Sequence, residues 1–93
     1  GEFETVAASA TAQALGATGA IGDYIERLIL QPAHVAAGPT TLLNGTTVVF
    51  TFTAGTLPTL APMTVELGMV ATEAGWKVTT GTSIAVLAIG NFT

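Results

Sequence analysis

The sequence has 93 residues, which is enough for one domain with a single modest core and too short for a second core. Only two residues are cationic, Arg27 and Lys77, against six acidic ones, so the net charge of −4 argues against binding to nucleic acid or to an anionic membrane. The absence of cysteine removes disulfides, thiolate metal ligands and cysteine nucleophiles.

The chain is 49% hydrophobic and only 9% charged, whereas roughly a quarter of the residues of an average soluble domain are charged. An isolated monomer would therefore expose a weakly charged, apolar surface, which oligomerisation would partly cover. The first residues lack a positive region followed by an apolar run, and no stretch of about 18 uninterrupted apolar residues occurs. We expect neither a signal peptide nor a transmembrane helix.

Residues 1–20 are mostly small, uncharged and rich in glycine and alanine, and they show no clear periodicity. We interpret them as an extended N-terminal arm, followed by a single β domain over residues 21–93. A short helix over residues 8–15 is an alternative, because alanine favours helix and Gly16 would end it.

From Asp23 the pattern predicts a strand that ends at Pro32. Its two faces are predicted to be Tyr24, Glu26, Leu28 and Leu30 on one side, and Ile25, Arg27 and Ile29 on the other. The alternation is imperfect, and a helix of one and a half turns over residues 24–30 is the competing interpretation.

Residues 40–43 lead into Asn44-Gly45, a dipeptide that favours the two central positions of a type I′ hairpin turn. The following run over residues 46–53 predicts the clearest strand of the chain, with Val48, Phe50 and Phe52 facing inward.

Further strands are predicted over residues 63–69, 76–79 and 84–89. The last of these is apolar on both faces, so both must be covered, either by a second sheet and a long loop or by a neighbouring subunit. Five or six short strands separated by turn signals predict an all-β fold, a small antiparallel β-sandwich or barrel of the jelly-roll kind.

Candidate chemical sites are sparse. His34 has no second histidine or cysteine with which to share a metal, so we interpret it as an exposed loop residue. Asp23, Glu26 and Glu66 could supply carboxylates for acid–base chemistry or calcium, but no motif brings them together. We expect a solvated Asp23 that closes a turn, with Glu26 near Arg27.

Other short patterns have simpler explanations. Gly16, Gly19 and Gly22 lack the Lys-Ser/Thr of a phosphate-binding loop, and glycines so spaced suit tight turns or close backbone approach. Ser9 and Ser83 lack the surroundings of a hydrolytic nucleophile. The glycosylation acceptor pattern occurs at Asn44 and Asn91, but three-residue matches are common by chance and no secretory signal supports these two. We therefore predict no catalytic, cofactor-binding or metal site.

The aromatic residues allow one binding hypothesis. A sugar-stacking platform could form from Trp76 with Tyr24, Phe50, Phe52 and Phe92. Aromatic residues at strand spacing are more often part of a core, so the exposure of Trp76 decides between the two interpretations.

The chain resembles small virion proteins of tailed bacteriophages, most closely capsid decoration (cement, head auxiliary) proteins. The resemblance rests on the segments ALGATGAIGDYI (14–25), GWKVTTG (75–81) and VLAIG (86–90), and on a Gly/Ala/Thr-rich texture over residues 8–93. It implies a compact β domain that trimerises on the outer surface of the virion capsid and binds the major capsid protein. The N-terminal arm would then join neighbouring capsid subunits by strand addition.

Three functional hypotheses follow from this sequence. The first is a non-enzymatic, homotrimeric decoration protein that stabilises the capsid shell. The alternative is a carbohydrate- or receptor-binding β module of a tail fibre or surface protein. An enzyme subunit whose active site is completed by a partner is the least favoured.

Overall fold

The computed structural model describes residues 2–17, 20–33, 38–52 and 62–93, and within them every regular element is a β-strand. Alternating apolar residues and frequent β-branched side chains favour strands over helices here. The eight strands are β1 (Glu2–Val6), β2 (Gln13–Ala14), β3 (Tyr24–Pro32), β4 (Thr40–Asn44), β5 (Thr47–Phe52), β6 (Met63–Val70), β7 (Trp76–Thr80) and β8 (Ile84–Asn91).

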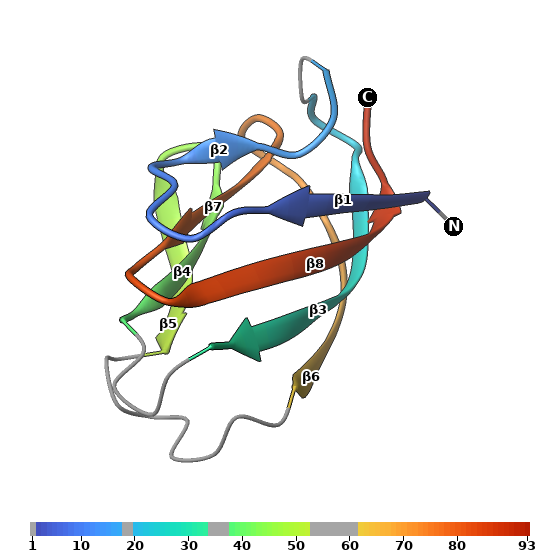
Figure 1. Cartoon of the computed structure of the whole chain (residues 1–93). Coiled ribbons are helices and arrows are strands. Elements are labelled where there is room, and N and C mark those ends of the chain that lie inside the picture. The colour runs from blue at the N-terminus through green and yellow to red at the C-terminus, as the bar shows by residue number, and fades with distance from the viewer. Residues whose placement is uncertain (1, 18–19, 34–37, 53–61) are drawn as a thin grey trace.

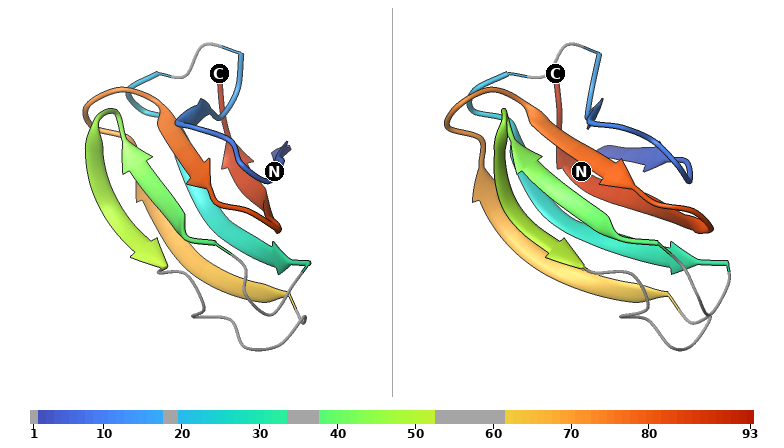
Figure 2. Two further views of the ribbon diagram at one scale, coloured as in Figure 1. Left: turned by 60° about the vertical axis from the view of Figure 1, so that its left-hand side comes forward. Right: turned by 90° about the vertical axis from the view of Figure 1, so that its left-hand side faces the viewer.

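These strands form two antiparallel sheets that pack face to face (Figures 1 and 2). Sheet A has the order β1-β8-β3-β6, and sheet B has the order β2-β7-β4-β5. Except at the β4–β5 hairpin, each step from one described strand to the next crosses between the sheets. This is the strand order of a jelly roll, and the predicted all-β sandwich is confirmed.

The core lies between the sheets and is built from side chains that alternate along the strands. In β8, Ile84, Val86 and Ala88 point inward and are almost fully buried, and in β7 Trp76 and Val78 do the same. Trp76, with 1% of its surface exposed, is among the largest fully buried side chains. The inward side chains of the two edge strands β5 and β6 pack against this core and are partly buried.

The N-terminal segment belongs to the sandwich, which corrects the predicted arm over residues 1–20. β1 pairs with β8 from Glu2 opposite Gly90 to Val6 opposite Val86, and β2 pairs with β7. Val6 and Leu15 are both fully buried in the core. The small residues between them form turns that carry the chain from sheet A to sheet B, and the alternative helix over residues 8–15 does not form.

A β-bulge explains the imperfect alternation in β3. Ile25 pairs with Gly90 of β8, but Arg27 pairs with Ile89, so β3 contains one extra residue at this point. The bulge places Ile25 on the inner face together with Leu28, whereas the sequence pattern predicted opposite faces. The competing helix over residues 24–30 is likewise corrected to a strand.

The β4–β5 hairpin forms as predicted but with a different turn. Asn44 pairs with Thr47, so Gly45 and Thr46 are the central residues, and the positive φ of 64° falls on Gly45 as in a type II′ turn. A second register shift inserts one residue into β5. Val48 consequently points outward and is 56% exposed, which corrects its predicted inward position, whereas Phe50 and Phe52 pack against the core.

Candidate interaction surface

The outer face of sheet A carries large apolar side chains in adjacent strands. The register of sheet A aligns its outward residues in two rows, which are Phe3–Ile89–Arg27–Glu66 and Thr5–Leu87–Ile29–Thr64. We call the apolar part of these rows, made of Phe3, Thr5, Ile29, Leu87 and Ile89, the sheet A face. It is continuous because directly opposed side chains in neighbouring strands lie about 4.5–5.5 Å apart.

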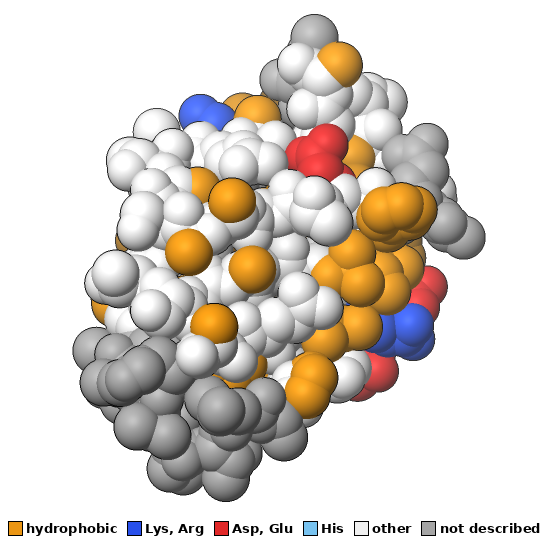
Figure 3. All heavy atoms as spheres, viewed as in Figure 1, with side chains coloured by type: hydrophobic (Ala, Val, Ile, Leu, Met, Phe, Trp, Pro, Cys, Tyr) orange, Lys and Arg blue, Asp and Glu red, His pale blue; other side chains and the backbone are white. Residues whose placement is uncertain are grey.

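The sheet A face is accessible in the single chain. Phe3 is 72% exposed, and Ile29, Leu87 and Ile89 are half-buried. Figure 3 looks onto this side of the molecule and shows hydrophobic side chains gathered next to a group of charged ones. Both faces of β8 are apolar, and the structure covers the inner one fully and the outer one only in part.

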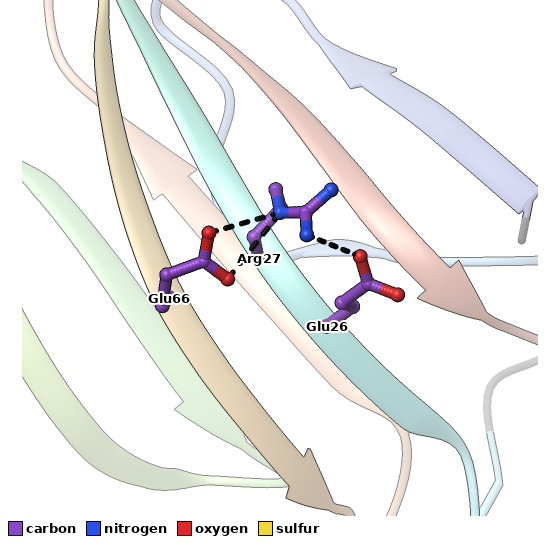
Figure 4. Close-up of polar contacts among 3 residues, drawn as sticks. All are labelled: Glu26, Arg27 and Glu66. Carbon is purple, nitrogen blue, oxygen red and sulfur yellow. Dashed lines mark hydrogen bonds and ion pairs between the residues drawn. The ribbon is translucent and has the colours of Figure 1, made fainter.

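Three charged residues border the sheet A face (Figure 4). Arg27 Nη2 lies 2.6 Å from Glu26 Oε2, and Arg27 Nε lies 3.2 Å from Glu66 Oε1 on the neighbouring strand β6. The predicted proximity of Glu26 and Arg27 is confirmed, and the pairing of β3 with β6 adds Glu66. One guanidinium between two carboxylates is a solvent-accessible ion pair network with a local charge of −1.

The outer face of sheet B has a different character. Pairing aligns Thr79, Thr41 and Thr51 across β7, β4 and β5, and the hydroxyls of Thr41 and Thr51 are 3.3 Å apart. The next row contains Lys77, Leu43 and the exposed Val48. This face carries both polar and apolar side chains, with threonines in its central row. The outer faces of the two sheets are therefore chemically distinct.

Asp23 is buried, which corrects the prediction of a solvated side chain. Only 4% of its surface is exposed. Its Oδ2 accepts hydrogen bonds from the backbone N–H groups of Ala20 and Thr93, each at 3.1 Å, and its Oδ1 accepts one from the Thr93 hydroxyl at 2.9 Å. The carboxylate thus closes the turn before β3, as predicted, and also fixes the end of the chain.

We expect Asp23→Asn to lower the free energy of unfolding by about 1–3 kcal/mol, because an amide has one acceptor oxygen where the carboxylate uses two. Urea unfolding followed by circular dichroism measures this change. Glu26→Gln, the same chemical change at a more exposed carboxylate, should alter stability by less than about 0.5 kcal/mol. Equal effects of the two substitutions would contradict a structural role for the buried carboxylate.

Trp76 belongs to the core and cannot stack on a sugar. Its Nε1 donates a hydrogen bond of 2.9 Å to the backbone carbonyl of Asp23, which satisfies the only polar atom of the ring. Phe92 is 8% exposed, and Phe50 and Phe52 contact each other edge to face with ring centroids 5.1 Å apart. Only Tyr24, at 36% exposure, remains accessible among the residues of the predicted platform.

The glycines before β3 have conformational roles, as expected. Gly16 has a φ of 90°, and a Cβ there would lie 2.8 Å from the backbone of Thr93. Gly22 has a φ of 97° and lies in the turn that leads into β3. Gly19 and His34 lie outside the described residues, so the interpretation of His34 as an exposed loop residue stays a prediction.

The remaining polar candidates are parts of turns. Ser9 and Ser83 adopt φ values of 60° and 58° in the turns that follow β1 and precede β8. The Asn44 amide is used internally: Nδ2 donates to the Thr72 hydroxyl at 2.8 Å, and Oδ1 accepts from the N–H groups of Thr72 and Glu73. Glycosylation of Asn44 would break this contact, whereas Asn91 is exposed at the end of β8.

The side chains described by the structure do not include a group of three or more His, Cys, Asp or Glu residues placed to hold a metal ion. In the same part of the chain, no helix has the length and hydropathy needed to cross a membrane.

Comparison of the chain with protein families, with characterised proteins and with solved structures gives no significant match. Among the described residues, the sheet A face is the candidate interaction surface, because it brings Phe3, Leu87 and Ile89 together on adjacent strands. Sequence reasoning identified one of its components, the doubly apolar strand over residues 84–89. It missed Phe3 and Ile29, because their position beside β8 depends on strand pairing between distant parts of the chain.

Proposed function

We propose that this chain is a non-enzymatic virion structural protein, a capsid decoration protein that acts as a homotrimer. It would bind the major capsid protein on the outer surface of a tailed-phage capsid and stabilise the shell. The observation that carries this proposal is the sheet A face, a partly exposed apolar surface on a small domain that has few charges. Such a surface suits a protein that works as one copy among many in an assembly.

Two further features support a structural role. The polar groups that could have served chemistry are used to hold the fold, as the contacts of Asp23 and Asn44 illustrate. The repeated geometry of a capsid lattice also makes many weak contacts sufficient, because multivalency raises the overall affinity. Since residues 2–6 pair within the chain's own sheet, attachment by a free arm is not part of the proposal.

Light scattering and co-sedimentation test this function together. The purified chain is measured for its solution mass and is then centrifuged with tailed-phage capsid shells that lack their decoration protein. We expect a mass three times the 9.3 kDa of one chain, and co-sedimentation that saturates at a fixed number of copies per shell. Chain that stays in the supernatant at every shell concentration would contradict the proposal, and an unrelated acidic β protein serves as the control.

The carbohydrate-binding alternative would have to use Tyr24 without Trp76, because Trp76 is enclosed in the core. One half-exposed aromatic ring is a weak basis for a sugar site. Screening the wild-type chain against a glycan array tests this alternative.

A further inference from the structure

We propose that Asn44 is a site of spontaneous deamidation that the fold keeps unreactive. It reacts when the contact between the β4–β5 hairpin and the turn over residues 71–75 opens. The Asn44-Gly45 dipeptide lies in that hairpin, and its hydrogen bonds join it to the turn. The site is independent of the proposed function, because it depends only on contacts within one chain.

An asparagine followed by glycine loses its side-chain amide without an enzyme, a cofactor or an oxidant. The main-chain nitrogen of Gly45 attacks Cγ of Asn44, and this new bond closes a five-membered succinimide ring while the Cγ–Nδ2 bond breaks. The proton of the Gly45 N–H leaves with the amide group as ammonia. Water then opens the ring at either carbonyl and gives aspartate or isoaspartate. Glycine favours ring closure because it has no Cβ to crowd the ring.

In the folded chain, both reacting groups are held by the turn over residues 71–75. Nδ2 of Asn44 donates to the Thr72 hydroxyl at 2.8 Å, and Oδ1 accepts from the N–H groups of Thr72 and Glu73, each at 3.2 Å. The Gly45 N–H, whose nitrogen is the nucleophile, donates to the Gly75 carbonyl at 3.1 Å. The amide carbon and the attacking nitrogen are therefore fixed by different partners.

The direction of the Gly45 N–H prevents ring closure. When this group loses its proton, the lone pair that attacks lies where the N–H bond was, so it points at the Gly75 carbonyl and not at Cγ of Asn44. Attack requires aligned orbitals, so the peptide must first rotate. A Cβ at Gly45 would lie 3.0 Å from Cβ of Glu73, so the hairpin and the turn are in close contact and must separate for this rotation.

The two products affect this contact differently. Aspartate keeps both the main-chain path and an oxygen that accepts from Thr72 and Glu73. Isoaspartate carries the main chain through the former side chain and adds one carbon to it. Asn44 pairs with Thr47 across a two-residue turn, so the extra carbon disturbs the register of the hairpin and withdraws the group that bound the turn. Formation of isoaspartate is therefore an irreversible record that the contact has opened.

Peptide mapping by mass spectrometry tests the site. The wild-type chain is incubated at neutral pH, once in buffer and once unfolded in urea. We expect Asn44 to deamidate at least about tenfold more slowly in the folded chain, because the rate follows the population of the open form. Asn91 is the internal control: it is exposed and precedes the bulky Phe92, so it should react slowly in both states. Equal rates at Asn44 in the two states overturn the proposal.

A matched pair of substitutions tests the contact. Thr72→Val removes the hydroxyl that accepts from Nδ2 of Asn44, and Thr64→Val makes the same change at an exposed threonine of β6. We expect Thr72→Val to raise the folded-state deamidation rate at least about threefold, which is the effect of losing one hydrogen bond, and Thr64→Val to leave it unchanged. In urea all three chains should react alike. A wild-type rate in folded Thr72→Val contradicts the assigned contact.

Hydrogen exchange distinguishes opening of this contact from unfolding of the whole chain. In Thr72→Val, exchange of the Gly45 N–H should accelerate with deamidation, while the amides of the central strand β8 keep their wild-type protection. Equally accelerated exchange throughout β8 would show that deamidation follows global unfolding, and the role of the local contact would be wrong.

The consequence of the reaction is tested on the isoaspartate form. It is separated by ion exchange after the chain has been aged in urea and refolded, and its urea midpoint is measured. We expect a midpoint below that of the wild-type chain. Asn44→Asp has the same charge and an unaltered main chain, so its midpoint should lie closer to the wild-type value. Equal midpoints for the isoaspartate form and the wild-type chain overturn the proposed effect on the hairpin.

Discussion

Removal of residues 1–15 should abolish the folded state. The truncation deletes β1 and β2, one edge strand from each sheet, and takes Val6 and Leu15 out of the core. Loss of a buried aliphatic side chain costs about 2–5 kcal/mol, and a whole small domain has only about 5–15 kcal/mol of stability. Circular dichroism and one-dimensional proton NMR of the truncated chain should show an unfolded polypeptide.

Point substitutions within residues 1–15 show whether the truncated chain unfolds because core packing is lost or only because the chain is shorter. Val6→Asp puts a charge into a fully buried position, and Ala8→Asp puts it two residues later at an exposed one. We expect the first to unfold the chain and the second to change the free energy of unfolding by less than about 0.5 kcal/mol. A truncated chain that still unfolds cooperatively at the wild-type urea midpoint would instead support the extended arm predicted from the sequence.

Trp76→Ala should lower the free energy of unfolding by about 3–5 kcal/mol, a large fraction of the stability of a domain of this size. The indole ring is 1% exposed, so its removal leaves a cavity between the sheets and breaks the hydrogen bond to the Asp23 carbonyl. Urea unfolding gives the change. The tryptophan fluorescence of the wild-type chain should also be blue-shifted relative to that of the unfolded chain.

Trp76→Phe is the matched control for this prediction. It keeps an aromatic ring in the core and removes the indole N–H, while the Asp23 carbonyl retains its hydrogen bond of 2.8 Å from the Ala71 N–H. The loss of stability should therefore be smaller than for alanine, about 1–2 kcal/mol. If alanine at position 76 leaves stability unchanged and removes binding to a glycan, Trp76 is a surface ligand contact and its place in the core is wrong.

The strands that are most regular in sequence could be predicted from it. In β6, Met63, Val65, Leu67 and Met69 alternate with Thr64 and Glu66, and this period of two fixes which residues face the core. In β3 and β5 the register shifts, and one inserted residue reverses the faces beyond it. The outward position of Val48 and the inward position of Ile25 follow from these shifts, which depend on the paired strand.

The N-terminal segment could not be placed by its own composition. Alanine, serine and threonine in residues 7–12 indicate neither strand nor helix. β1 becomes a strand because it pairs with β8, whose residues lie 80–88 positions further along the chain. A local sequence pattern does not indicate which distant strand a segment will pair with. The same reason explains why Glu66 could not be joined to Glu26 and Arg27 from the sequence.

The candidate site was predictable only in outline. The two apolar faces of residues 84–89 indicated that a second surface needs cover, and the outward position of Leu87 and Ile89 agrees with this expectation. Which side chains extend that surface depends on the strands on either side of β8. The carboxylate of Asp23 was misjudged because its partner Thr93 lies 70 residues further along the chain.

The position of β8 between β1 and β3 also sets the order in which the protein can fold. While the ribosome is still synthesising the chain, β1 and β3 have been made but lack the strand that joins them, and both expose unpaired main-chain groups. Sheet A can be completed only after β8 has been synthesised, because β8 is the strand that joins β1 to β3. Proteins dominated by such distant pairings fold in milliseconds to seconds, and during this interval the exposed strand edges are prone to aggregation.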